Sequence, residues 1–473
     1  MLLNAVVPGV VLLGLVIFVH ELGHFLMAKW RGVKVLKFSL GFGPALFSVT
    51  RGETEYRVSW VPLGGYVQMA GDSPGPDGTM PGGENQFLSH PWYGRVLICL
   101  AGPAANLLTA FVVMVTVGLV GVSYPDYPNR LGAVPDTSVA YRAGLRPGDA
   151  IAAVNDVPVK TWVQIFFTNS KQPREKPVDV RVERGERSFV VPLGPEQREP
   201  FFSSLQRPAV PPVVGSVVTG MPAYKAGLKE GDWIVAVNGR PVTTWDELPR
   251  ALRGTVDHPV RLRVKRAGRE FDVVVTPINP DGRDSRNARI GIEPPYAGVF
   301  LEHHGLLESI DLGFRATVSM VGSVYGGLWL TISRPLYYRE YVGGPLFIAQ
   351  AASEQARRGL DAYLQFLAMI NIAIMAFNLL PLPVLDGGHV LLALIEAVRR
   401  QSISARAYLT FQKVGLVVMG TLFVLILAND PLRLVQRQRA LEKAPRGVPA
   451  RSAGPAPTSH AAPRERPLAP APP

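Results

Sequence analysis

Residues 20–24 read His-Glu-Leu-Gly-His and follow an apolar stretch, residues 6–19, that carries no charge. Two histidines four positions apart lie on one face of a helix, so the imidazoles of His20 and His24 can bind one metal ion. The carboxylate of Glu21 can then accept a proton from water held at that ion, as in a hydrolytic zinc site. An ionisable residue at the bilayer centre costs about 2.5–3.5 kcal/mol on insertion scales, so three in one apolar helix indicate a compensating role such as metal binding.

Two other interpretations of this stretch are a polar helix face and a secretory signal peptide. The helix has no further polar residues that would complete a polar face. A signal peptide would carry Lys or Arg before its apolar region, whereas residues 1–4 contain neither, and the charges fall where cleavage would be expected. The sequence therefore favours a membrane helix that carries a metal site.

The composition indicates membrane spans together with a sizeable aqueous part. Of 473 residues, 47% are apolar, which is high for a soluble protein and low for a protein built only of membrane helices. The single cysteine, Cys99, excludes an intrachain disulfide and a metal site built of cysteines. The formal net charge is +12, and a Pro/Ala-rich, basic tail at residues 431–473 is expected to be disordered. No basic face with interleaved aromatic residues is apparent, so nucleic acid is not an expected partner.

Four apolar segments are long enough to cross about 30 Å of hydrocarbon as helices. They are residues 5–28, 96–122, 363–380 (with a continuation through 389–398) and 409–428. The short loops after the first and third segments are rich in Lys and Arg and should face the cytoplasm. The N-terminus and residues 123–362 would then lie on the opposite side, and the lipid bilayer is an expected partner.

Residues 35–70 do not have the composition of a simple loop. Residues 55–61 are typical of a strand, and residues 51–53, Arg-Gly-Glu, can form the turn of a hairpin. Non-helical backbone at membrane depth must be covered by protein or line a cavity, so we expect a membrane-associated β-hairpin region beside the metal site. Such a strand could pair with an extended substrate, and a hairpin on the cytoplasmic surface is the alternative.

An internal repeat occupies residues 131–296. Residues 140–149, Ala-Tyr-Arg-Ala-Gly-Leu-Arg-Pro-Gly-Asp, recur as residues 223–232, Ala-Tyr-Lys-Ala-Gly-Leu-Lys-Glu-Gly-Asp, and strand-like runs follow each copy. Both copies resemble the PDZ fold, which implies two PDZ domains of α+β type at residues 131–207 and 208–296. PDZ domains bind extended peptides or C-termini along a sheet edge, so a peptide is an expected partner.

A catalytic zinc site needs a third protein ligand besides the two histidines. Asp386 lies where two prolines and two glycines break a helix, and a carboxylate at membrane depth is strongly disfavoured unless it is paired or metal-bound. His389 is a rival ligand in the same segment. The His303-His304 pair is another rival, but the predicted topology places it on the outer side, away from His20. A set of two histidines and one carboxylate could also bind divalent ions other than zinc.

Several motifs, in this order along the chain, resemble the site-2 protease family of intramembrane zinc metalloproteases. They are the motif at residues 20–24, Ala-Gly-Pro-Ala-Ala-Asn at 101–106, the tandem repeat, Val-Gly-Gly-Pro at 342–345 and the run from 378 to 388. The likeness covers about residues 1–430 and is closest to the bacterial regulator-of-sigma-E type with two PDZ domains.

The resemblance implies the roles of the site residues. His20, His24 and Asp386 would bind Zn²⁺, and Glu21 would act as the general base. Asn378 would contact the substrate or the oxyanion that develops on it.

The resemblance is incomplete at one position. The family suggests a further asparagine five positions before Asn378, where this chain has Ala373, and the nearest amide is that of Asn371.

The resemblance also implies a metalloendopeptidase of the bacterial inner membrane that cleaves transmembrane segments of single-span proteins in regulated intramembrane proteolysis. Anti-sigma-factor-type proteins after a first cut, and signal peptide remnants, would be its substrates. The PDZ domains would lie on the periplasmic side, and the active site would face the cytoplasm.

The expected architecture is a polytopic α-helical membrane protein of about four transmembrane helices with two inserted PDZ domains. Residues 1–130 would form the N-terminal membrane part, and residues 297–430 the C-terminal membrane part, before the tail at 431–473. A non-catalytic PDZ adaptor and a zinc-responsive transporter are the alternatives. An adaptor needs no glutamate such as Glu21 between two histidines in lipid, and a transporter needs polar residues along several helices.

Overall fold

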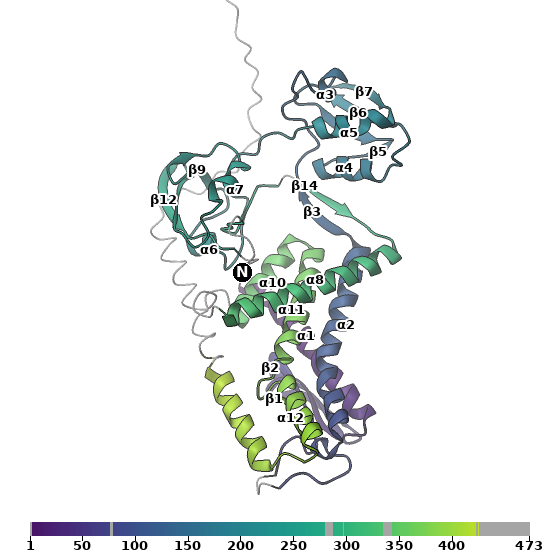
Figure 1. Cartoon of the computed structure of the whole chain (residues 1–473), viewed down its shortest axis with the longest axis vertical. Coiled ribbons are helices and arrows are strands. Elements are labelled where there is room, and N and C mark those ends of the chain that lie inside the picture. The colour runs from purple at the N-terminus through teal and green to yellow at the C-terminus, as the bar shows by residue number, and fades with distance from the viewer. Residues whose placement is uncertain are drawn as a thin grey trace, which may run out of the picture.

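Three of the four predicted membrane segments form helices that are long and apolar enough to span a bilayer. They are α1 (Leu2–Trp30), α2 (Trp92–Val120) and α11 (Leu360–Asn378). In Figure 1 they run along the long axis of the molecule, and α2 contacts both α1 and α11.

The computed structural model describes residues 2–75, 79–279, 287–296, 298–333, 343–421 and 424. In the fourth predicted segment, residues 409–421 are helical, whereas residues 425–428 lie outside the described residues. The same holds for the predicted tail at 431–473 and for Val342 of the Val-Gly-Gly-Pro motif.

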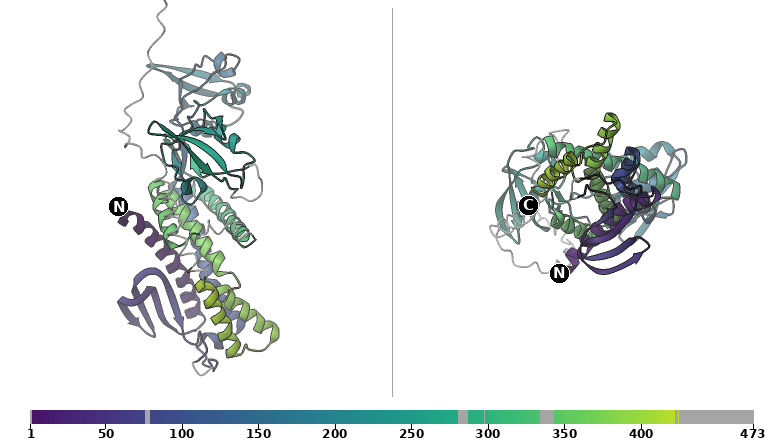
Figure 2. Two further views of the ribbon diagram at one scale, coloured as in Figure 1. Left: turned by 90° about the vertical axis from the view of Figure 1, so that its left-hand side faces the viewer. Right: turned by 90° about the horizontal axis from the view of Figure 1, so that it is seen from below.

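The predicted hairpin region forms two long, bent strands, β1 (Val35–Arg51) and β2 (Thr54–Met69), joined by a turn at Gly52, whose φ is +63°. The first half of β1 lies between the two halves of β2, because Phe38 is opposite both Val67 and Tyr56. This curled sheet lies beside α1, at the end of the bundle away from the repeats (Figure 2).

Apolar side chains cover the outward surface of this sheet. Phe47 is 66% exposed and Trp60 is 65% exposed. An apolar patch of this kind indicates contact with lipid or with a partner, as expected for a membrane-associated hairpin.

The two copies of the internal repeat form two units of the same architecture, here called the first repeat (residues 131–207) and the second repeat (208–296). The first contains α3 (Val139–Arg142), β4 (Ala150–Val154), β5 (Val157–Pro158), α4 (Trp162–Ser170), β6 (Val178–Arg184), β7 (Arg187–Leu193) and α5 (Pro195–Ser204). The second contains β8 (Ser216–Val217), α6 (Pro222–Lys225), β9 (Trp233–Val237), β10 (Arg240–Pro241), α7 (Glu247–Leu252), β11 (Val260–Arg266), β12 (Arg269–Val275) and β13 (Ile292–Glu293). Their main sheets have equivalent strand orders, β5-β4-β6-β7 and β10-β9-β11-β12, and each unit has its own hydrophobic core.

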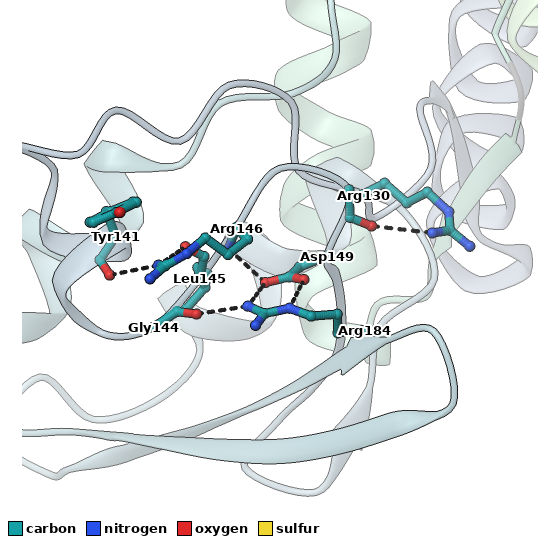
Figure 3. A network of polar contacts seen from close by, with 8 residues as sticks. Arg130, Tyr141, Gly144, Leu145, Arg146, Asp149 and Arg184 are labelled. Carbon is teal, nitrogen blue, oxygen red and sulfur yellow. Dashed lines mark hydrogen bonds and ion pairs between the residues drawn. The ribbon is translucent and has the colours of Figure 1, made fainter. Parts of the chain in front are cut away.

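The aspartate that ends each copy of the repeated sequence is a structural residue. Asp149 is buried and accepts hydrogen bonds from Arg184 Nε at 2.7 Å and Nη2 at 2.8 Å, and Arg184 also donates to Gly144 O (Figure 3). In the second repeat, Arg266 donates two hydrogen bonds to the carboxylate of Asp232 in the same bidentate arrangement. A bidentate pair of this type fixes the turn after the short helix to the sheet, which explains why the repeat contains this aspartate.

A two-stranded ribbon connects the repeats to the membrane helices. β3 (Val122–Asp126) leads from α2 into the first repeat, and it pairs with β14 (Gly298–Glu302), which leaves the second repeat. After the ribbon come α8 (Leu306–Ser333) and α10 (Pro345–Arg358), which pack on α2 and on α1, respectively. The chain is thus a membrane protein with an inserted β-rich part, as the sequence predicts at this level.

Candidate metal centre

Three side chains from two distant parts of the sequence converge between α1 and α12 (Asp386–Arg399). His20 Nε2 lies 3.2 Å from His24 Nε2, and Asp386 Oδ2 lies 3.2 Å from the first nitrogen and 3.3 Å from the second. Both histidines are 6% exposed. Within the described ranges, these are the His, Cys, Asp and Glu side chains whose ligand atoms are grouped closely enough to hold a metal ion.

The dimensions of this triangle fit zinc. Zinc bonds of about 2.0–2.1 Å in a tetrahedral arrangement separate the ligand atoms by roughly 3.3 Å. The observed separations of 3.2, 3.2 and 3.3 Å match that value. Two imidazoles and one carboxylate also leave a fourth position open, which is the pattern of a catalytic site.

The break between α11 and α12 brings Asp386 to the histidines. α11 ends at Asn378, and Val384 has a φ of +75° before α12 begins at Asp386. A methyl group on Gly387 would lie 2.5 Å from Leu379 O, so only a glycine lets the first turn of α12 fold back against the preceding segment.

The approach of α1 to α2 orients His24. The His24 ring donates from Nδ1 to Ile98 O at 2.8 Å, which leaves Nε2 for the metal position. Gly102 of α2 lies against this ring, because a methyl group there would stand 2.6 Å from the ring's Cε1. Gly23 of α1 faces α2 in the same way, with Ala105 Cβ 2.9 Å from the position of a methyl group. The glycines allow the two helices to approach closely enough for this hydrogen bond.

Glu21 shares a cavity of about 420 Å³ with the three ligand atoms. The end of β2 forms one wall of this cavity, including Tyr66, Val67 and Met69. Val67 lines this cavity together with Glu21. The predicted strand therefore lies beside the cluster and beside the carboxylate that follows the first histidine.

Asn378 also lies at the cluster, with its amide nitrogen 3.1 Å from His20 Nε2. Asn371 is fully buried but donates to Leu367 O of its own helix at 2.9 Å, and it is not among the residues that line the cavity. The cavity therefore contains one of the two asparagines expected from the family resemblance.

The rival ligands are not part of the metal cluster. His389 lines the same cavity, but its Nδ1 is 3.2 Å from the hydroxyl of Tyr408, and it is not part of the cluster. His303 lies at the far end of α2, 3.5 Å from Leu119 O, and the backbone N–H of His304 donates to Gly118 O.

Sequence reasoning gave no role to Asn106, although it ends the Ala-Gly-Pro-Ala-Ala-Asn motif. The structure places its amide 3.3 Å from His20 Nδ1, on the side of the ring opposite the cluster. A polar residue inside the apolar second segment was the available signal.

Comparison with known proteins extends these observations to the whole chain. The family model of peptidase family M50 matches residues 8–422. The chain is 32% identical over 460 residues to the regulator of sigma-E protease RseP of Salmonella typhimurium (strain 14028s / SGSC 2262), covering 90% of this chain and 98% of that protein. It is 31% identical to RseP of Escherichia coli (strain K12), again covering 90% of this chain and 98% of that protein. A Treponema pallidum (strain Nichols) protein, named as a candidate zinc metalloprotease, is also 31% identical over 90% of this chain and 98% of its own length. This chain therefore belongs to peptidase family M50 and is a zinc-dependent metalloendopeptidase of the membrane.

Proposed function

We propose that His20, His24 and Asp386 bind the zinc and that Glu21 is the general base of peptide hydrolysis. The observation that carries this proposal is the triangle of ligand atoms, with sides of 3.2–3.3 Å, in one cavity with the Glu21 carboxylate. When bound there, zinc polarises the scissile carbonyl and activates water.

The protein side chains then carry the proton and the developing charge. Glu21 takes a proton from the attacking water and delivers it to the leaving amine. Val67 of β2 lines the same cavity as this carboxylate. The Asn378 amide lies where it can donate to the carbonyl oxygen as that oxygen gains negative charge.

The second half of β2 is the proposed binding site for the substrate backbone. An intact helix hides its carbonyls in hydrogen bonds to N–H groups four residues later, so a transmembrane substrate must unwind before it is cut. Among the described strands, residues 65–69 pair with β1 and with no other strand, and three of them line the cavity. An unwound segment can add to this edge as a further strand.

The proposed substrates are transmembrane segments of single-span membrane proteins. The relatives named as regulators of sigma-E protease support anti-sigma-factor-type substrates after a first cut, and signal peptide remnants are a second class. The basic loop after α1 supports a location in the bacterial inner membrane with the metal site toward the cytoplasm and the repeats in the periplasm.

We further propose that the repeats are two PDZ domains that exclude proteins with large ectodomains. In the second repeat, the Ala223 N–H donates to Ile290 O, in the segment before β13 that forms one side of a cavity of about 640 Å³ beside α7. In the first repeat, the equivalent Ala140 N–H donates to Ser204 Oγ of α5.

The helix α5 therefore provides the acceptor for this N–H in the first repeat. It buries Phe201 and Phe202 in the core of the first repeat. Both repeats nevertheless keep a cavity of similar size, about 630 Å³ beside α5 in the first and about 640 Å³ beside α7 in the second, in which an extended peptide could bind.

Cleavage of a single-span substrate with a short ectodomain, in membranes, tests the proposed chemistry. Wild type should cleave it, and Glu21→Gln should lose at least 100-fold in rate while it retains zinc, because an amide cannot accept the proton. Equal cleavage by both proteins would refute the role of Glu21. It would favour the non-catalytic adaptor if it recurred with several substrates.

A further inference from the structure

We propose that Asn106 is a positioning residue that keeps the ring proton of His20 on Nδ1 and so leaves Nε2 free to bind the metal. The inference rests on the zinc site proposed above and adds to it a residue of α2. Asn106 is fully buried, and its side-chain Nδ2 lies 3.3 Å from His20 Nδ1, so that the amide reaches this ring nitrogen.

The chemistry of a neutral imidazole sets the requirement. Such a ring carries one N–H and one bare nitrogen, and only the bare nitrogen can bind a metal. His20 Nε2 points to the cluster, at 3.2 Å from both His24 Nε2 and Asp386 Oδ2, and Asn378 Nδ2 lies 3.1 Å from it. The ring proton must therefore be on Nδ1, where Asn106 is the neighbour that can accept it.

His24 shows the same arrangement with a different acceptor. Its Nδ1 lies 2.8 Å from Ile98 O, and a backbone carbonyl can only accept a hydrogen bond. Both rings thus present Nε2 to the cluster and Nδ1 to α2. The support for His24 comes from the backbone, whereas the support for His20 depends on a side chain that substitution can change.

The amide of Asn106 can pair with either neutral tautomer of His20. With Nδ2 toward the ring, it donates to a bare Nδ1, and the Nε2 proton then faces Asp386 Oδ2. In that orientation the buried Oδ1 has no hydrogen-bond partner among the described residues. A half-turn of the amide places Oδ1 toward Nδ1–H, and this is the orientation that metal binding requires.

Asp and Leu at this position separate the role of the acceptor from that of packing. A carboxylate can only accept, so Asn106→Asp should hold the ring proton on Nδ1 and keep zinc affinity at or above that of wild type. Leucine has the same branched shape and no acceptor, so Asn106→Leu should bind zinc about 10–100-fold more weakly, as for other residues that support a metal ligand. Asn371→Leu is the matched control, because Asn371 is an equally buried amide that bonds within α11.

The measurement is the zinc dissociation constant of the full chain in detergent micelles, from competition with a chromophoric chelator. The inference is overturned if Asn106→Leu binds zinc as tightly as wild type, or if Asn106→Asp is weakened as much as Asn106→Leu. Should the leucine variant fail to fold, Asn106→Ala and Asn106→Asp provide the same comparison. His20→Ala tests the underlying site: undiminished zinc binding there would refute the proposed ligand set and this inference with it.

Discussion

Replacing Gly102 by alanine should damage the metal site while it changes the chain by a single methyl group. The added Cβ would stand 2.6 Å from Cε1 and 2.8 Å from Cδ2 of the His24 ring. Carbon atoms in good contact lie about 3.5–4.0 Å apart, so the ring or the helix must move by about 1 Å. A shift of that size at a reacting group can lower the rate about 100-fold, which corresponds to roughly 2.7 kcal/mol of the barrier.

Two assays separate this effect from a general loss of structure. The cleavage rate of a single-span substrate in membranes should fall about 100-fold in Gly102→Ala, and its zinc affinity should fall with it. Gly94→Ala is the control on the same helix, because a methyl group there would meet its nearest atom, Arg31 Nη2, at an ordinary 3.4 Å. Wild-type rate and zinc affinity in Gly102→Ala would refute the reasoning, since they would mean that the His24 ring does not need its present position.

Three further predictions follow from the site and the repeats. Asp386→Asn should weaken zinc binding at least tenfold, because a neutral amide oxygen is a poorer ligand. The control is Asp361→Asn: the carboxylate of Asp361 accepts a hydrogen bond from Ser123 N, and its replacement should leave zinc affinity unchanged. Burial alone would raise the pKa of Asp149, but the hydrogen bonds from Arg184 outweigh it and hold that pKa below its usual value. The stability that this pair gives is therefore present above the unfolded pKa of about 3.9 and is lost as pH falls through the folded pKa. Hydrogen exchange should show the first repeat opening in acid. At neutral pH, Asp149→Asn should lower the free energy of unfolding by about 1.5–3 kcal/mol. Removal of residues 131–296 should permit cleavage of a substrate that keeps its large ectodomain, and an uncut substrate would contradict the size filter.

The spacing of residue types was enough to predict much of the candidate site. Positions 20 and 24 share a helix face by geometry alone, and the prolines and glycines around Asp386 indicate a break at membrane depth. The distance between α1 and that break could not be predicted from spacing, because it depends on packing between segments more than 350 positions apart. The position of Asp386 just before the glycine pair favoured it over His389, and the resemblance to a known family supported that choice.

Other elements were not predicted because tertiary contacts decide them. The internal repeat predicts the same fold for both copies, yet the Ala140 N–H bonds to Ser204 Oγ of the helix α5, whereas the equivalent Ala223 N–H bonds to the backbone carbonyl of Ile290. The buried side chains of Phe201 and Phe202 stabilise that helix in the core of the first repeat. The contact of Asn106 with His20 could not be predicted from the sequence either. An amide in an apolar segment indicates that a polar contact exists, but not which residue makes it.

The packing of α1 on α2 links the stability of the bundle to the geometry of the metal site. Lipid is as apolar as the helix surfaces, so burial of apolar side chains does little to hold two membrane helices together, and close van der Waals contact and hydrogen bonds must do so. Here Gly23 and Gly102 provide the close contact, and the bond from His24 to Ile98 O provides the polar one. The interactions that join the helices are thus the ones that orient a proposed zinc ligand. A methyl group at Gly23, which faces Ala105 and not the ring, should therefore weaken helix packing first and zinc binding only as a consequence, whereas one at Gly102 should affect both together.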